Sequence, residues 1–215
     1  MKLDEIAEKY VTDKRSREHN YTQFYEKYFE SLRDKELKIL EIGIYRPPVN
    51  SGREVGASLK TWYEYFPKAK IYGVDLTDFT DVENDRIKTL ICDQSKREEL
   101  NNIVDQIGGD FDIIIDDGGH TMEQQLVTLG YMFKFLKPSG IFVIEDLHTS
   151  YLSPFAYNKT GTANTALNVL YSFQKEGKIY SEFMLEEEIQ HLNNEIKKCD
   201  VHKGNTSEIS FIIKK

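Results

Sequence analysis

A short apolar run followed by an acidic, glycine-rich turn stands at 111–120, with the sequence Phe111-Asp112-Ile113-Ile114-Ile115-Asp116-Asp117-Gly118-Gly119-His120. Its first half is short and nearly all apolar, which is typical of a central strand covered on both faces of a sheet. A helical stretch follows over 121–136, and a second apolar run covers 141–144. This order of strand, helix and strand predicts a βαβ unit with parallel strands.

The same alternation extends toward the N-terminus. Apolar runs rich in branched residues predict further strands at 37–44, 70–75 and 87–91. Between them, helices are expected at 56–66 and 95–107. Ser95 with Glu98 three residues later predicts a capping box at the start of the second helix. The chain is therefore expected to fold as an α/β protein around a parallel sheet.

The two ends of the chain depart from this alternation. Residues 1–36 are polar and aromatic with helical spacing at 3–10 and 22–32, and we expect an N-terminal helical lid or interface segment there. At the other end, we expect a surface loop at 151–165, a helix at 166–174, and an antiparallel hairpin formed by 195–202 and 208–213. Residues 37–215 would then form one α/β domain.

The composition is that of an ordinary single domain. The chain has 215 residues, with 28 Lys plus Arg, 36 Asp plus Glu and a formal net charge of -8. This balance argues against a nucleic-acid partner, because phosphate contacts need a surplus of basic side chains. We find no signal peptide and no apolar run near the ~18 residues of a membrane span, so we expect a cytoplasmic protein with no membrane partner. Cys92 and Cys199 form no zinc or disulfide pattern and are expected to be reduced thiols.

Acidic residues recur where the expected strands end. They are Glu41, Asp75, Asp93, Asp116, Asp117, Glu145 and Asp146. Ligands of an open α/β sheet bind beyond the carboxyl ends of its strands, so these acids indicate a site at that edge. The first strand is followed by a long loop without GxGxxG spacing, which favours a cofactor that has no diphosphate. From spacing alone, Asp75 is equally well read as a ribose ligand or as a turn former.

Several motifs resemble those of class I S-adenosylmethionine-dependent methyltransferases. The matching segments are Leu40-Glu41-Ile42-Gly43, Gly73-Val74-Asp75, Cys92-Asp93-Gln94-Ser95 and 112–117. Segments 116–120, 136–140 and 144–151, together with Thr12-Asp13-Lys14, are similar to the macrocin and mycinamicin sugar O-methyltransferases. The resemblance covers roughly residues 8–151. It implies a Rossmann-like, mostly parallel seven-stranded sheet with a C-terminal antiparallel hairpin and helices on both faces.

The resemblance implies a role for each residue around S-adenosylmethionine. Glu41 would bind the methionine amino group, Gly43 would allow close backbone approach, and Ser58 would help to hold the carboxylate. Asp116 would lie beneath the methionyl part.

At the other end of the cofactor, Asp75 would accept hydrogen bonds from the ribose hydroxyls. Asp93 and Gln94 would flank the adenine. Cys92 stands where relatives often have Gly, and Gly119 where they often have Ser.

A second set of residues implies metal-assisted catalysis. Asp117, Glu145 and Asp146 at neighbouring strand ends would repel one another unless a cation lay between them, and oxygen ligands suit Mg²⁺. In the sugar O-methyltransferases the matching positions hold a divalent metal. His120 could then act as the general base that takes the proton of an acceptor hydroxyl. The expected function is methylation of a hydroxyl on a sugar or glycosylated small molecule.

Other functions stay open at this point. A metal-independent N- or O-methyltransferase would not need the three carboxylates, and a non-catalytic binding protein would not need His120. The missing GxGxxG argues against a nicotinamide-dependent oxidoreductase. The acceptor could be a nucleotide-sugar, a glycosylated metabolite or a polysaccharide precursor. The aromatic N-terminal segment and the family resemblance predict a homo-oligomer, and His148 is read as structural.

Overall fold

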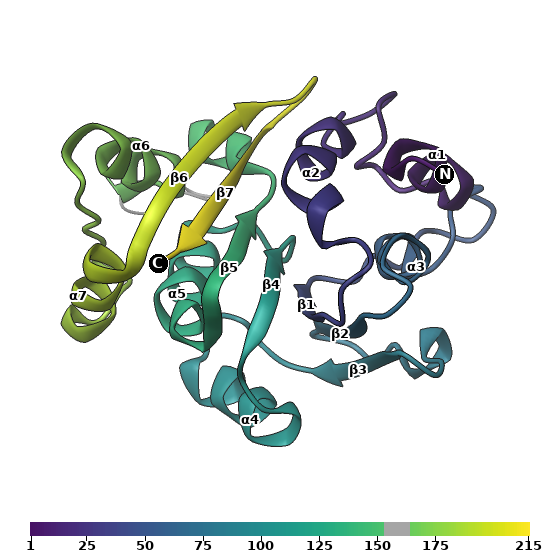
Figure 1. Ribbon diagram of the computed structural model, residues 1–215, viewed down its shortest axis with the longest axis horizontal. Helices are drawn as coiled ribbons and strands as arrows, with labels where there is room; N and C mark the ends of the chain where they lie inside the picture. The colour runs from purple at the N-terminus through teal and green to yellow at the C-terminus, as the bar shows by residue number, and fades with distance from the viewer. Residues whose placement is uncertain (153–163) are drawn as a thin grey trace.

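The computed structural model describes residues 1–152 and 164–215, and a sheet of seven strands lies at the centre of this described part (Figure 1). The strand order is β3-β2-β1-β4-β5-β7-β6. The strands are β1 (Lys38–Ile42), β2 (Lys70–Asp75), β3 (Ile87–Ile91), β4 (Phe111–Asp116), β5 (Leu136–Ile144), β6 (Ile196–Lys203) and β7 (Glu208–Lys214). β1 to β5 pair in parallel, whereas β7 is antiparallel to both β5 and β6. The expected sheet and closing hairpin are confirmed.

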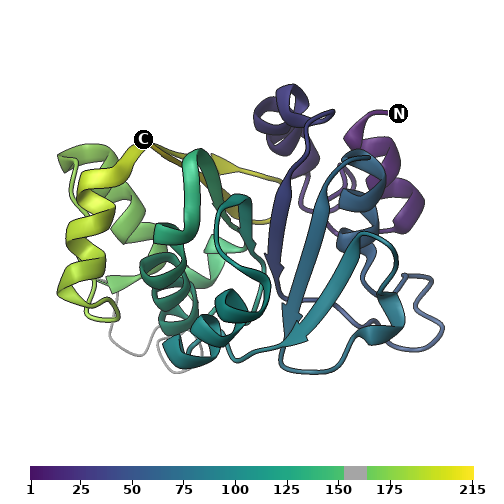
Figure 2. The ribbon, with the colours of Figure 1, turned by 60° about the horizontal axis from the view of Figure 1, so that its bottom comes forward.

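Helices cover both faces of the sheet (Figure 2). The α-helices are α1 (Leu3–Tyr10), α2 (Thr22–Phe29), α3 (Ala57–Tyr65), α4 (Arg97–Ile107), α5 (Met122–Met132), α6 (Ala166–Glu176) and α7 (Glu186–Glu195). Short 3-10 helices are η1 (Glu30–Leu32), η2 (Thr80–Val82), η3 (Phe133–Phe135) and η4 (Leu147–Tyr151). Side chains alternate along each strand, so Ile114 joins the core under α4 to α7, while Ile113 and Ile115 join the core under α1 to α3.

Two local expectations are wrong. The helix expected over 121–136 was predicted to be closed by a turn at 137–140, but residues 136–140 begin β5, whose pairing with β4 is irregular between Phe111 and Ile113. The predicted capping box of Ser95 and Glu98 is not formed, because α4 begins at Arg97 after Lys96. Ser95 instead donates to Asp93, and the Asp93 amide donates to Glu99.

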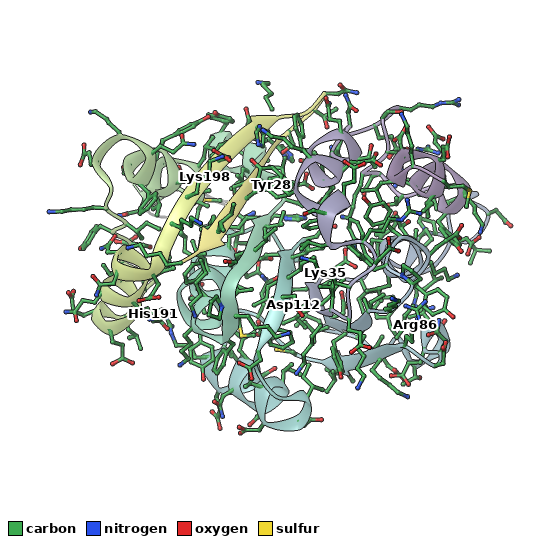
Figure 3. The ribbon with its side chains drawn as sticks, viewed as in Figure 1. Tyr28, Lys35, Arg86, Asp112, His191 and Lys198 are labelled. Carbon is green, nitrogen blue, oxygen red and sulfur yellow. The ribbon has the colours of Figure 1, made fainter. Side chains whose placement is uncertain are left out.

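The N-terminal helices are part of the packed structure. Leu3 and Ile6 of α1 and Tyr25 and Phe29 of α2 are fully buried. Tyr28 of α2 stacks on Phe211 of β7 with 4.1 Å between ring centroids (Figure 3). The segment 11–21 between the two helices therefore has a fixed position at the carboxyl-end edge of the sheet. Whether 1–36 acts as a lid separate from 37–215 stays a prediction.

Three further expectations concern the rest of the chain. The predicted loop at 151–165 lies mostly outside the described residues. Among the described residues, no helix combines the length and apolar character needed to cross a membrane. Cys92 and Cys199 are buried free thiols, and burial raises the pKa of each to about 12, as expected for inert cysteines.

Candidate functional site

A cavity of about 310 Å³ opens beyond the carboxyl ends of β1, β2 and β4, where the sequence predicted a ligand site. Its size lies at the lower end of the range for ligand pockets. The predicted residues that line it are Gly43, Ser58, Asp75, Gln94, Asp117, His120 and Asp146. Four others, Glu41, Asp93, Asp116 and Glu145, do not line it. The cavity walls also include Thr12, Asp13 and Lys14 from the N-terminal segment.

Gly43 allows two loops to meet beneath the cavity. Its φ of 94° suits glycine, and a Cβ at this position would lie 2.0 Å from the carbonyl oxygen of Asp117. Its amide donates to Val74 O, and the Asp117 amide donates to Ile42 O. The loop after β1 is thereby pressed against the loop after β4, which carries the predicted catalytic residues.

Glu41 is a fully buried carboxylate at the end of β1. One oxygen, Oε2, accepts a hydrogen bond of 3.0 Å from Ser58 Oγ at the start of α3. The other, Oε1, has no hydrogen-bond partner among the described residues and lies 3.9 Å from Lys14 Nζ. Burial raises the pKa of Glu41 to about 7. A free oxygen on a desolvated carboxyl group is the kind of acceptor that an ammonium ligand would stabilise.

Asp75 serves its own turn and also faces the cavity. Its Oδ2 accepts from the Ile44 amide at 2.9 Å, and its Oδ1 accepts from the Thr77 amide at 3.0 Å. The turn-forming reading of Asp75 is therefore confirmed. The ribose reading stays a prediction, because carboxylate oxygens accept more than one bond.

Gln94 connects three parts of the site. Its Nε2 donates to Asp116 Oδ1 at 2.9 Å, and its Oε1 accepts from the Gly119 amide at 2.9 Å. Burial raises the pKa of Asp116 to about 6, and among the described residues its Oδ2 has no hydrogen-bond partner. Gln94 thus orients Asp116 and the loop that carries His120. Asp93 is turned toward Ser95 and Lys96, and its predicted place beside adenine stays untested.

The structure brings Asp117, His120 and Asp146 into one group. One ligand atom from each lies within 4.8 Å of the others. His120 Nε2 is 3.9 Å from Asp117 Oδ1 and 3.6 Å from Asp146 Oδ2. Two carboxylates and an imidazole form a donor set that fits a hard or borderline divalent ion. Burial alone would raise the pKa of Asp146, but His120, His19 and a hydrogen bond from Tyr21 hold it below its usual value.

Glu145, the third carboxylate predicted to bind metal, lies outside this group. Both of its oxygens are 2.9 Å from Lys14 Nζ, and Oε1 also accepts a short hydrogen bond from the Tyr25 hydroxyl. Burial, with Asp117 nearby, raises the pKa of Glu145 well above its usual value despite Lys14. Its backbone follows β5 as expected, but its side chain points toward the core under α2.

Lys14 is the functional candidate that sequence reasoning passed over. Its side chain is 1% exposed, and its Nζ lies 2.5 Å from Asp117 Oδ2. Although burial would lower the pKa of Lys14, Asp117, Glu145 and Glu41 raise it well above its usual value. The available signal was the Thr12-Asp13-Lys14 motif, which resembled the family but suggested no role.

Two other histidines approach the same carboxylate. His19 Nε2 is 3.9 Å and His148 Nδ1 is 4.0 Å from Asp146 Oδ1. His148 Nδ1 also lies 2.7 Å from Ser207 Oγ at the start of β7, which agrees with the structural reading of this residue.

Comparisons with known proteins agree with the predicted resemblance. No family model matches the chain. Mycinamicin VI 2''-O-methyltransferase of Micromonospora griseorubida is 36% identical over 155 residues, which are 71% of this chain and 38% of that relative. Demethylmacrocin O-methyltransferase of Streptomyces fradiae is 36% identical with the same coverage. An 8-demethyl-8-alpha-L-rhamnosyl tetracenomycin-C 2'-O-methyltransferase of Streptomyces olivaceus is 37% identical over 64% of this chain and 35% of that relative.

A solved structure extends the likeness to the whole fold. The MycE methyltransferase of the mycinamycin biosynthetic pathway, in complex with Mg, SAH and mycinamycin VI, is 28% identical with a TM-score of 0.83. The match covers 100% of this chain and 54% of that chain. The chain is thus a homologue of the sugar O-methyltransferases and has the class I methyltransferase fold, as predicted. It spans only 35–38% of the length of these three curated relatives.

Proposed function

We propose that this chain is an S-adenosylmethionine-dependent O-methyltransferase that methylates a hydroxyl of a sugar or glycosylated small molecule with the help of a divalent ion, Mg²⁺. The observation that carries the proposal is the group of Asp117, His120 and Asp146 at the wall of the cavity. A general base beside two carboxylates is what activation of a weakly acidic hydroxyl requires. The names of the curated relatives support the choice of sugar hydroxyls.

The cofactor would occupy the part of the cavity next to β1 and β2. Glu41 lies behind the wall of this cavity, and its Oε1, which has no hydrogen-bond partner among the described residues, would accept from the methionine ammonium group. Ser58 at the N-terminus of α3 would lie close to the methionine carboxylate. Asp75 would bind the ribose hydroxyls. Asp93 and Gln94 belong to the adenine end, and Asp116 lies below the methionyl part. The MycE structures contain SAH, the demethylated form of this cofactor.

Asp117 and Asp146 would hold the divalent ion, with His120 beside them. The donor set fits such an ion, since Asp117 Oδ1 and Asp146 Oδ2 both lie within 4 Å of His120 Nε2. When bound, the ion lowers the pKa of a coordinated acceptor hydroxyl. The MycE structures contain Mg. Glu145 was predicted as a further ligand. In this structure both of its oxygens contact Lys14 Nζ, and one of them also accepts from the Tyr25 hydroxyl.

In the reaction, His120 Nε2 takes the proton of the acceptor hydroxyl. The oxygen attacks the methyl carbon of the sulfonium, the new C–O bond forms and the C–S bond breaks. The products are a methyl ether, S-adenosylhomocysteine and a proton held on His120. Asp146 and Asp117 would stabilise the imidazolium, since both lie within 4 Å of Nε2.

The proposed function is tested by methyl transfer from labelled S-adenosylmethionine to a panel of nucleotide-sugars and glycosylated metabolites. We expect His120→Ala to lower kcat by about 10²–10⁴-fold while S-adenosylhomocysteine still binds. The matched control is His191→Ala, which changes a histidine on α7 (Figure 3). Unchanged turnover in His120→Ala would remove the assigned base. Full turnover in EDTA would favour the metal-independent alternative.

We further propose a cytoplasmic homo-oligomer whose acceptor is a small molecule, with neither nucleic acid nor membrane as a partner. The net charge of -8 supports the exclusion of nucleic acid. Exposed apolar side chains such as Tyr180 and Leu185 support an interface. Light scattering coupled to size-exclusion chromatography measures the oligomeric state, and a monomeric mass would overturn that part of the proposal.

A further inference from the structure

Two histidines outside the cofactor cavity flank Asp146, and the proposed reaction gives neither of them a task. His19 belongs to the segment 11–21, and His148 belongs to η4. Neither lines the cavity, whereas Asp146 does. Both lie near Asp146 Oδ1, while His120 lies 3.6 Å from the other oxygen, Oδ2. Asp146 therefore has the assigned base at one oxygen and two further imidazoles at the other.

The two imidazoles are each bound by a hydroxyl group of the β6–β7 turn. The Thr206 hydroxyl forms a short hydrogen bond with His19 Nδ1, and the Ser207 hydroxyl lies 2.7 Å from His148 Nδ1. In His148 this bound nitrogen is also the one nearest Asp146 Oδ1, at 4.0 Å. In His19 the nitrogen nearest Asp146 is Nε2, at 3.9 Å, and among the described residues Nε2 makes no hydrogen bond. Of the two, His19 is therefore the one with an unused ring nitrogen on the side of the site.

The ring of His19 is held in one orientation. It stacks on the Tyr21 ring with 5.1 Å between ring centroids and 16° between the ring planes. The His19 amide donates to Asp13 O, and the His19 carbonyl oxygen accepts from the Asn205 amide, both at 2.9 Å. The side chain is 21% exposed, so a ligand can reach it. Because a neutral imidazole has one donor and one acceptor, Nε2 has one hydrogen bond left to make in either tautomer.

The separation between the Nε2 atoms of His19 and His120 suits a pair of neighbouring hydroxyls. His19 Nε2 lies 3.9 Å from Asp146 Oδ1, and His120 Nε2 lies 3.6 Å from Asp146 Oδ2. The two nitrogens are thus no farther apart than these two distances and the width of one carboxylate allow. A vicinal diol with a hydrogen bond of about 2.8 Å at each end spans about 8 Å, which is within that limit.

We propose that His19 is an acceptor-binding residue whose Nε2 forms a hydrogen bond with a hydroxyl next to the one that His120 deprotonates, so that the sugar is held across Asp146. The inference rests on the proposed function and deepens it, because it adds a requirement for a free hydroxyl beside the methylated one. It leaves the ligands predicted for the divalent ion, the acidic cluster of Asp117, Glu145 and Asp146, unchanged.

The test records the histidine ring nitrogens by long-range proton–nitrogen NMR of the full chain with Mg²⁺ and S-adenosylhomocysteine, with signals assigned by single substitutions. The probe is methyl α-L-rhamnopyranoside, a neutral sugar with three neighbouring hydroxyls. We expect the sugar to shift Nε2 of both His19 and His120 and to leave His191 unchanged. Among analogues that each lack one hydroxyl, one should shift His120 but not His19. If no analogue separates the two signals, or if His120 alone responds to the complete sugar, the inference is wrong.

Steady-state kinetics give a second readout. His19→Ala should raise KM for the sugar about threefold to tenfold, as expected for one lost hydrogen bond, and leave kcat within about twofold. Wild type should form one methyl ether isomer and His19→Ala a mixture, while His19→Gln, whose amide can replace Nε2, should recover most of the affinity. His148→Ala is the matched control, since it removes the other imidazole bound to the same turn, and it should keep the wild-type KM and product. If the rhamnoside is not methylated, the NMR comparison still decides.

Mn²⁺ binding separates a role in acceptor binding from support of the acidic cluster. Measured without acceptor by electron paramagnetic resonance of free Mn²⁺, the affinity of His19→Ala should equal that of wild type. A loss of Mn²⁺ affinity would instead assign His19 to holding Asp146 and would overturn the inference. If no sugar shifts His120, the proposed function fails together with the inference, whereas a shift of His120 alone leaves the proposed function intact.

Discussion

His120 and Asp146 both adopt left-handed backbone conformations, with φ of 57° and 53°. Residues other than glycine rarely adopt this left-handed conformation, because it strains the backbone. Such strain persists where the surrounding structure holds the residue in place. Each lies between a strand and a helical segment: His120 immediately precedes Thr121, the N-cap of α5, and Asp146 is the N-cap of η4. The strained turns aim both side chains at the same point, which an ordinary extended continuation of β4 and β5 would not do.

The pKa of Glu41 leads to a prediction about cofactor affinity. Burial raises this pKa from 4.5 to about 7, so Glu41 becomes increasingly protonated below pH 7. The methionine ammonium group needs the ionised form, and S-adenosylhomocysteine should therefore bind about tenfold more weakly at pH 6 than at pH 8. Calorimetric titration across this range measures it, and Glu41→Gln should bind weakly with little pH dependence.

The raised pKa of Glu41 also determines how the stability of the cofactor-free protein changes with pH. A carboxyl group whose folded pKa is raised binds its proton more tightly in the folded state. The contribution of Glu41 to the free energy of unfolding is therefore full below pH 4.5 and lost as the pH rises through about 7. If urea denaturation gives the same pH slope for wild type and Glu41→Gln between pH 4.5 and 7, the assigned pKa is wrong.

At the scale of residues, the sequence predicts what lies next to a strand end. Asp117 and Asp146 follow apolar runs, and parallel strands bring their ends together, so their proximity could be expected. Lys14, Tyr21 and Tyr25 could not be placed, because their contacts join residues more than 100 positions apart. The direction of the Glu145 side chain could not be predicted either, since strand alternation alone does not show that a buried lysine lies beside it.

Helix α5, which follows His120 in the chain, helps to fix the position of this residue. Thr121 is its N-cap and accepts from the Gln124 amide, while the Thr121 amide donates to Gln124 Oε1 at 3.2 Å. This capping box fixes the residue next to His120. It lies in the βαβ unit that predicted the fold. The box expected at Ser95 is not formed, because α4 begins at Arg97 and the Ser95 amide and hydroxyl donate to Asp93 instead.

Removing this cap should weaken the protein and disturb catalysis. We expect Thr121→Ala to lower the free energy of unfolding by about 1 kcal/mol, because the first turn of α5 loses its side-chain acceptor. Thr121→Ser keeps the hydroxyl and should remain close to wild type. Urea denaturation measures both, and equal stability of the two variants would show that the cap does not hold the helix.

At the scale of elements, the regular units were predictable and their joints were not. β1 to β4, α6 and the closing hairpin lie close to their predicted ranges because apolar periodicity and turn residues agree there. Residues 136–140 contain Pro138 and Gly140 and resemble a loop, yet they extend β5 to the edge of β4. Tertiary pairing overrides local propensity at that point.

Over the whole molecule, the turn between β6 and β7 lies beside the segment that joins α1 to α2 (Figure 1). The Asn205 amide in the β6–β7 turn donates to His19 O at 2.9 Å, and Asn205 Nδ2 donates to Ser16 O at 3.0 Å. From the other side, Arg53 pairs with Glu18 at 2.6 Å. The segment that carries Lys14 and Tyr21 is therefore held in place by the C-terminal turn and by the loop before α3.

Gly204 provides a test of this long-range docking. A Cβ at this position would lie 2.1 Å from His19 O, so Gly204→Ala must push the turn and the N-terminal segment apart. We expect a loss of about 1–3 kcal/mol in the free energy of unfolding. Because Lys14 and Tyr21 belong to the displaced segment, Mn²⁺ affinity should change as well.

Gly177→Ala is the matched control for this substitution. Gly177 has a φ of 69°, and no described atom lies within 4 Å of its Cβ position, so alanine there adds backbone strain of about 1 kcal/mol without touching segment 11–21. It should lose stability yet bind Mn²⁺ as wild type does. If Gly204→Ala also keeps wild-type Mn²⁺ affinity, the docking of the β6–β7 turn on segment 11–21 does not position the acidic cluster, and the sheet alone would hold Asp117 and Asp146 in place.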